Sequence, residues 1–135
     1  MRYMMIMRST NEAQEAAKDV PFDEILTAMG RYNESMIEAG VLLAGEGLAG
    51  PEEGFVVDFS SDPPAVRDEP YRGELFNGFW IISVSSKGEA VQWATRCPLG
   101  PGVTLEVRRV HETEEFPQDN AYVQKEVQRR AAAKK

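Results

Sequence analysis

The residues best suited to chemistry are charged and aromatic side chains gathered around one acidic turn, Asp68-Glu69-Pro70-Tyr71. They occupy predicted strand ends, or a strand face near the turn, and Arg8 falls close to them. Charges that converge beside aromatic rings are typical of clefts that bind small molecules. We therefore predict a ligand-binding site made of Glu46, Asp68, Tyr71, Glu74, Trp80 and Arg108.

Asp68 and Glu46 are the candidates for catalysis within this set. A carboxylate acts as a general acid or base when burial raises its pKa, and a nearby cation can then hold an oxyanion. That chemistry would suit an isomerase or a lyase. The structural alternative is that Asp68 caps its own turn and that Glu46 pairs with Arg108 across strands.

Other kinds of site lack their usual motifs. The single His111 and the single Cys97 form no metal-ligand cluster, and Cys97 falls on the inner stripe of a predicted helix, as a small buried apolar residue does. Residues 45–50 spell GxGxxG, but a strand and not a helix is expected next, so the glycines predict a bend. We expect no metal site and no cofactor.

Composition restricts the partners. The formal net charge of −7 disfavours nucleic acid and anionic membranes, which both require a positive surface. One cysteine excludes an intrachain disulfide and suits a reducing cytoplasm. The first nine residues become polar too soon for a signal peptide or a membrane span, so they predict a strand. We expect a cytoplasmic protein.

Hydrophobic periodicity predicts an α+β fold. Strands are expected at 2–8, 41–48, 79–84 and 103–110, a hairpin at 55–60 and 65–68, and helices at 22–39, 86–97 and 120–133, with 9–19 a solvated connection and 55–60 half-buried. Two helices alternating with antiparallel strands indicate a ferredoxin-like sheet with helices on one face. Residues 1–110 would form the domain, and 111–135 a mostly helical extension.

The sheet face away from the helices needs a cover. We predict that Phe79 and Ile81 face the helices, and that the open face carries Met4, Trp80, Ile82 and Val84. Such an apolar surface predicts a partner, most simply a second copy of the chain. The same argument favours a subunit interface over a cofactor site there.

Several short segments together resemble a known family. They are MRYMMIM at the start, EAGVLLAGEGL at 38–48, the turn at 68–71, GFW at 78–80, WATRCP at 93–98 and EVR at 106–108. In this order and spacing they resemble the YCII-related group, and within it the DGPF branch. Glu69 stands where that branch has Gly, and Tyr71 where it has Phe.

The resemblance implies a dimeric α/β-barrel assembly, in which two sheets face each other and enclose a cleft. It also implies a functional link to extracytoplasmic-function sigma factors. Some YCII-like proteins are thought to use a His–Asp pair, in the manner of muconolactone isomerases, but this chain has no His in its first half.

We therefore expect a small-molecule-binding homodimer. The alternatives are an isomerase or lyase with a carboxylate base, or a protein-binding accessory of a transcription system.

Overall fold

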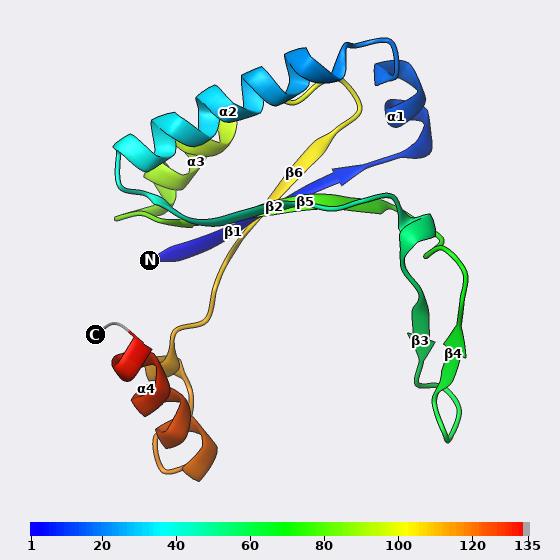
Figure 1. Cartoon of the computed structure of the whole chain (residues 1–135). Helices are drawn as coiled ribbons and strands as arrows, with labels where there is room; N and C mark the ends of the chain where they lie inside the picture. The colour runs from blue at the N-terminus through cyan, green and yellow to red at the C-terminus, as the bar shows by residue number, and fades with distance from the viewer. Residues whose placement is uncertain (134–135) are drawn as a thin grey trace.

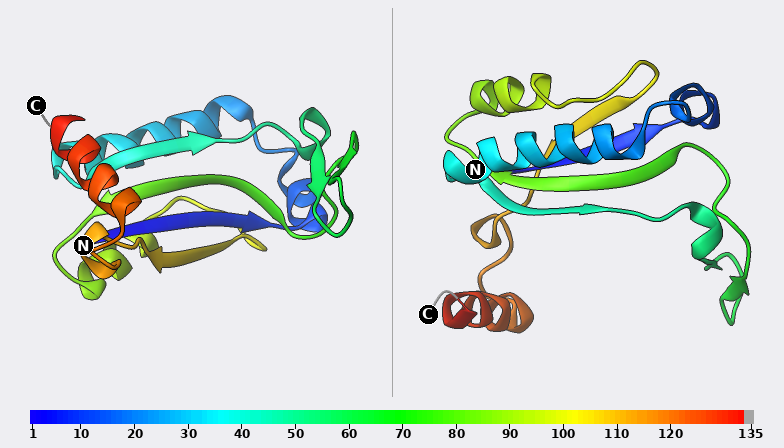
Figure 2. Two further views of the ribbon diagram at one scale, coloured as in Figure 1. Left: turned by 90° about the horizontal axis from the view of Figure 1, so that it is seen from below. Right: turned by 45° about the horizontal axis from the view of Figure 1, so that its top comes forward.

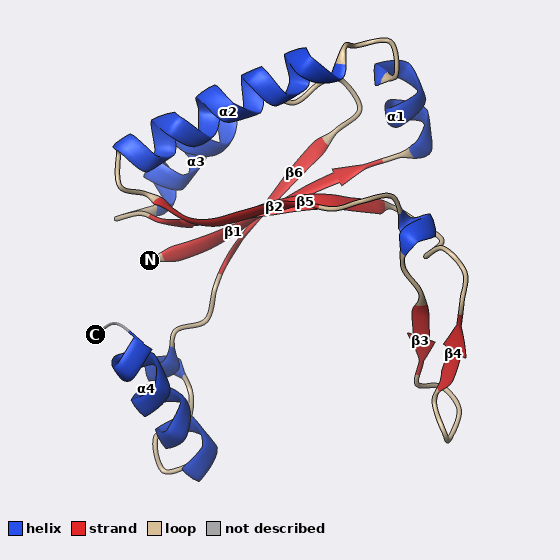
Figure 3. Ribbon diagram, viewed as in Figure 1, coloured by secondary structure: helices blue, strands red, loops and turns tan. Residues whose placement is uncertain are grey.

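The computed structural model describes residues 1–133, so Lys134 and Lys135 of the predicted extension lie outside the described residues. The chain has an α+β architecture (Figures 1 and 3). Its elements are β1 (Arg2–Ser9), α1 (Asn11–Ala17), α2 (Phe22–Glu38), β2 (Leu42–Gly47), η1 (Pro51–Glu53), β3 (Val56–Asp58), β4 (Ala65–Arg67), β5 (Leu75–Ser83), α3 (Lys87–Thr95), β6 (Thr104–Arg109), η2 (Thr113–Glu115) and α4 (Ala121–Ala133).

The central sheet has the strand order β2-β5-β1-β6, and every neighbouring pair is antiparallel. Helices α2 and α3 lie on one face of this sheet, and no helix within residues 1–133 packs along the other face (Figure 1). This arrangement confirms the predicted ferredoxin-like sheet with its helices on one side.

Local signals explain where the helices begin and end. Gly40 has φ +73° directly after α2, a left-handed conformation that glycine adopts without strain, and the Val41 amide donates to Met36 O at 2.9 Å. Helix α1 lies in the segment predicted as a solvated connection. Thr10 starts it, because its Oγ1 accepts from the Ala13 amide at 3.1 Å.

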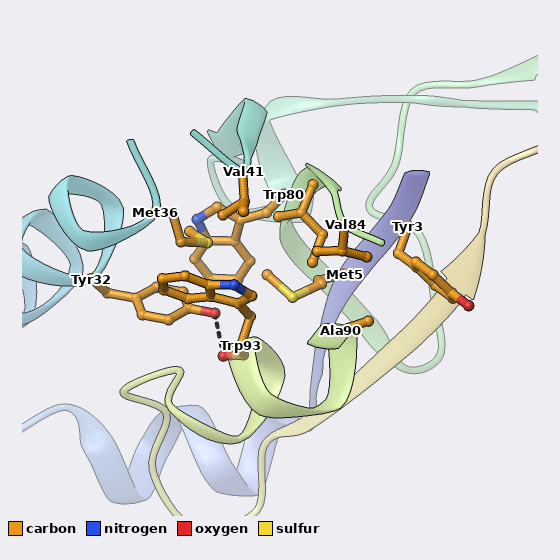
Figure 4. Packing of buried hydrophobic residues seen from close by; sticks show 10 residues of the cluster. Tyr3, Met5, Tyr32, Met36, Val41, Trp80, Val84, Ala90 and Trp93 are labelled. Carbon is orange, nitrogen blue, oxygen red and sulfur yellow. Dashed lines mark hydrogen bonds between the residues drawn. The ribbon is translucent and has the colours of Figure 1, made fainter. Parts of the chain in front are cut away.

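The core lies between the sheet and the two main helices (Figure 4). Met5, Met36 and Ile82 are fully buried at its centre. Its polar atoms are paired: the Tyr32 hydroxyl donates to Trp93 O at 2.7 Å, and the Trp80 indole N–H donates to an oxygen of Asn33 at 2.9 Å. Burial also raises the pKa of Tyr32, so this hydroxyl stays a donor at neutral pH.

The prediction for the two faces of β5 was wrong. Trp80 and Ile82 face the helices and belong to the core, whereas Phe79 and Ile81 lie half-exposed on the open face. The pairing agrees, since Trp80 lies opposite the buried Met5 of β1. The strand is apolar at both odd and even positions, so alternation alone does not show which set faces the helices.

Two arms extend from the open side of the sheet. The β3–β4 hairpin leaves one end of the strands and α4 stands near the other end (Figures 1 and 2). The predicted hairpin and terminal helix are both present. Within residues 55–60 only part of the segment is half-buried: Val56 and Asp58 are, whereas Phe55 is 66% and Phe59 77% exposed. An exposed two-stranded ribbon has no core of its own, so these rings need a cover from elsewhere.

Candidate functional site

A pocket of about 660 Å³ lies where the hairpin leaves the sheet. One wall is the loop from β2 into η1, and the opposite wall is the segment that leads into β5. The floor is the C-terminal part of β1. The lining residues are Arg8, Leu48, Ala49, Gly50, Pro51, Glu53, Gly54, Tyr71, Glu74, Leu75, Phe76 and Asn77.

Arg8 is the cation of this pocket. Its Nε lies 2.8 Å from Glu106 Oε1, and the second oxygen of Glu106 lies 3.6 Å from Nε of Arg108. The Arg8 guanidinium carbon also lies 6.0 Å from the centre of the Phe76 ring. An ion pair on one side and an aromatic ring on the other restrict the Arg8 side chain to the pocket wall.

A β-bulge creates this wall. Along most of the strands β1 and β5 pair residue for residue, but the register shifts after the pair Met7 and Gly78, so that Arg8 lies opposite Phe76 and Asn77 is left over. The extra residue turns Phe76 onto the open face beside Arg8. Without the bulge, Phe76 would share the helix-covered side with Gly78.

The structure brings some predicted site residues together and separates others. Tyr71 and Glu74 line the pocket with Arg8. Asp68 is exposed at the end of the hairpin and does not line this pocket, and Trp80 lies in the core on the other side of the sheet. A binding role for Trp80 therefore finds no support in the geometry of one chain.

Glu46 and Arg108 both point to the open face but stand on opposite edge strands. Three strand spacings of about 4.8 Å separate those edges, roughly 14 Å in all. The predicted cross-strand pair between them was therefore wrong within one chain. Arg108 instead lies near Glu106, and no side-chain partner of Glu46 occurs among the described residues.

The acidic turn carries Glu69 without backbone strain. Among the described residues only glycines have a positive φ, and Gly73, at +134°, is the one closest to this turn. The Glu69 carboxylate lies 3.3 Å from Nε of Arg67, which adds an ion pair that glycine could not make. Replacement of the branch's glycine is thus compatible with an ordinary backbone here.

The remaining candidates for chemistry have structural explanations. Residues 45–50 lead into the short η1 and then β3, so the α-helix N-terminus that a dinucleotide site needs does not follow them. The glycine at 45 has a structural reason, because a Cβ there would lie 2.9 Å from the Trp80 ring. Burial raises the pKa of the half-buried Cys97 thiol to about 12, which keeps it protonated. No group of three potential metal ligands occurs in residues 1–133.

Sequence reasoning missed Phe76 and the loop residues Leu48 and Pro51 as lining residues. Phe76 follows the same alternation as Trp80, so the one-residue shift at the bulge was not visible in the pattern. Leu48 carried a usable signal. Gly50-Pro51 marks a loop, and a large apolar side chain within a loop indicates a surface that contacts another group.

The YCII-related domain profile matches residues 1–114. The chain belongs to the YCII-related domain family. In this YCII-related protein the match covers the whole sheet, the helices on it, the hairpin and the pocket, and it ends inside η2. Helix α4 therefore lies beyond the family domain. No curated protein matches the chain, and none of its described helices combines the length and the apolar character needed to cross a membrane.

Proposed function

We propose that the protein is a homodimer of the DGPF branch that binds a small polar molecule in the pocket beside Arg8. The observation that carries this proposal is the convergence of Arg8, Tyr71 and Glu74 on one pocket. Its volume of about 660 Å³ lies in the range usual for small-molecule sites.

The composition of the pocket favours a ligand with more than one polar group. Arg8 offers N–H donors, Glu74 offers acceptors, and the exposed Tyr71 hydroxyl can do both. Phe76 and Leu48 supply apolar area against which a small carbon skeleton can pack. We infer a small acid or hydroxy acid, because its carboxylate suits Arg8 and its hydroxyl suits Glu74.

The open face supports the dimer. Met4, Phe79 and Ile81 form a half-exposed apolar strip along its centre, and Leu43 beside them is 54% exposed. An apolar sheet face rimmed by charges is the usual form of a subunit interface. The two arms leave the same side and would lie beside the ends of a second sheet packed there (Figure 2).

Charges on the rim support a two-fold arrangement. If the two-fold axis runs along the strands, β2 of one protomer comes to lie over β6 of its partner. Glu46 and Glu106 occupy the same cross-strand row, in line with Phe79 and Ile6. Glu46 would then approach the Arg108 next to Glu106 of the other protomer, and an ion pair that one chain cannot form would form twice in the dimer.

Thermal-shift screening with small carboxylic and hydroxy acids tests the ligand. We expect at least one acid to raise the melting temperature of the wild type in a concentration-dependent way, and this shift to vanish in Tyr71→Ala. Phe59→Ala, an exposed hairpin change outside the pocket, is the matched control and should keep the shift. No stabilisation by any acid, or equal shifts in both variants, would refute the pocket as the site.

A further inference from the structure

A second cavity lies on the helix-covered side of the sheet, at the same end as the bulge. It is a groove of about 530 Å³ between α1, the first half of α2 and the loop that follows α3. The residues around it are Met7, Ser9, Ala13, Gln14, Ala17, Val20, Glu24, Ile25, Ala28, Met29, Asn77, Pro98, Leu99, Gly100 and Val103. None of them is among the buried members of the core cluster, but Met7 and Met29 pack against that cluster, so the groove borders the edge of the main core.

Small side chains keep the groove open. Ala13, Ala17 and Ala28 present only methyl groups to it from the two helices. On the loop side, Gly102 has φ +83°, and a Cβ there would lie 2.9 Å from Cβ of Ala13. The loop and α1 are therefore already in contact at Gly102, and this contact limits how far the two walls can close by moving together.

The chemistry of the lining is selective. Most of its surface is aliphatic, and the described residues that line it include no lysine, arginine or histidine. Glu24, exposed at the rim, is the one charged group among the described residues that line it. The Ser9 hydroxyl already donates to Thr10 O at 3.3 Å, whereas the half-buried Asn77 side chain makes no hydrogen bond within residues 1–133 and can both donate and accept.

We propose that this groove binds a small, uncharged, apolar molecule with one hydrogen-bonding group. The aliphatic walls favour an apolar body, and the volume lies within the usual range for such sites. Glu24 at the rim opposes anions, because the described residues that line the groove include no cation to offset it. Asn77 offers the amide that a single hydroxyl, amine or carbonyl would meet. The site is distinct from the acid-binding pocket, although Asn77 borders both.

Fluorescence titration of the full chain with 1-aminoanthracene, a neutral aromatic amine, tests the proposal. We expect saturable binding of one molecule per chain, weakened at least about tenfold by Ala28→Phe, because the added ring occupies the groove. Ala17→Phe, at an exposed helix position, should weaken it in the same direction and serves if Ala28→Phe does not fold. Tyr71→Ala, in the other pocket, should leave it unchanged.

The charge preference is tested in the same assay with the anionic dye 1-anilinonaphthalene-8-sulfonate. It should bind the wild type at least about tenfold more weakly than 1-aminoanthracene, and Glu24→Lys should narrow that gap. The proposal is overturned if 1-aminoanthracene does not saturate, if both groove variants bind it as the wild type does, or if the anionic dye binds equally well. These outcomes leave the acid-binding pocket untouched, because its test uses other ligands and another variant.

Discussion

The two faces of the central sheet are built from alternate residues of the same strands, but they differ in how far they are buried. On the helix side Met5, Trp80 and Ile82 are at most 8% exposed, and the Trp80 N–H has its own acceptor. On the open side Ile6 is buried, but Met4, Phe79 and Ile81 remain partly exposed between rows of charge. Both sets are similarly apolar, so the difference lies in what covers them. The helices bury the first set, which therefore stabilises the single chain, whereas the exposed part of the second set stabilises only an assembly that covers it.

The largest effect is expected from truncation on the helix side. Trp80→Ala removes a ring packed edge-on against Tyr32 at 5.8 Å and leaves a cavity, so the free energy of unfolding should fall by about 3–5 kcal/mol. Phe79→Ala, one residue away on the open face, should cost only about 1 kcal/mol in dilute solution. Urea unfolding of both variants measures the contrast, and equal losses would contradict the difference between the faces.

A charge on the open face should act on association and leave folding intact. Ile81→Glu places a carboxylate in the centre of the apolar strip, where a facing sheet would bury it unpaired. We expect a wild-type dimer and a folded, monomeric variant at micromolar concentration, as measured by light scattering with circular dichroism as the folding control. A monomeric wild type would refute the sheet-to-sheet dimer.

Reversal of the rim charges should have a smaller effect. Glu46→Arg and Arg108→Glu should each weaken the dimer, and the double variant should regain part of the loss through a coupling energy of about 1 kcal/mol. Dissociation constants for the four proteins of this cycle give the coupling. Additive losses would show that Glu46 and Arg108 do not meet across the interface.

The smallest effect concerns the start of the α4 arm. The bidentate contact with Arg109, and the amide of Glu112, lower the pKa of Glu115 from its ordinary 4.5 to about 2. A lowered pKa in the folded chain means that this contact stabilises η2 above about pH 4.5, and that the stabilisation is lost as the pH falls toward 2.

Hydrogen exchange at the Glu112 amide reports on this contact. Relative to Glu115→Gln at the same pH, the wild-type amide should be protected at pH 6, and the difference should disappear near pH 2. A difference that does not change with pH would contradict the role of the Glu115 charge.

Much of this fold could be predicted from the sequence. The period of α2, its stop at Gly40 and the hairpin around Pro63-Pro64 are local signals, and they led to the correct order of all the strands and of α2, α3 and α4, but not to α1. Which residues of β5 face the helices could not be predicted, because its odd and its even positions are both largely apolar. The exposure of Phe59 could not be predicted either, since it depends on the direction in which the hairpin leaves the sheet.

The candidate site was predictable in part, again where the signal is local in the sequence. Tyr71 and Glu74 are near the acidic turn in sequence as well as in space, so proximity along the chain placed them correctly. Whether Glu46 can pair with Arg108 depends on the strand order, which places β2 and β6 on opposite edges of the sheet. The groove beside α1 escaped notice because α1 itself was not expected.

The unpaired Asn77 at the bulge is a position at which β5 could lose a residue and keep its pairing with β1. Without Asn77, Gly78 would join Phe76 directly, and a regular ladder would still place Phe76 opposite Arg8 and Leu75 opposite Ser9. The pocket would keep its ring, but the local bend and the one side chain that borders both cavities would be lost. Among related genes, an in-frame deletion of three nucleotides at this point should therefore be tolerated better than one elsewhere in β5.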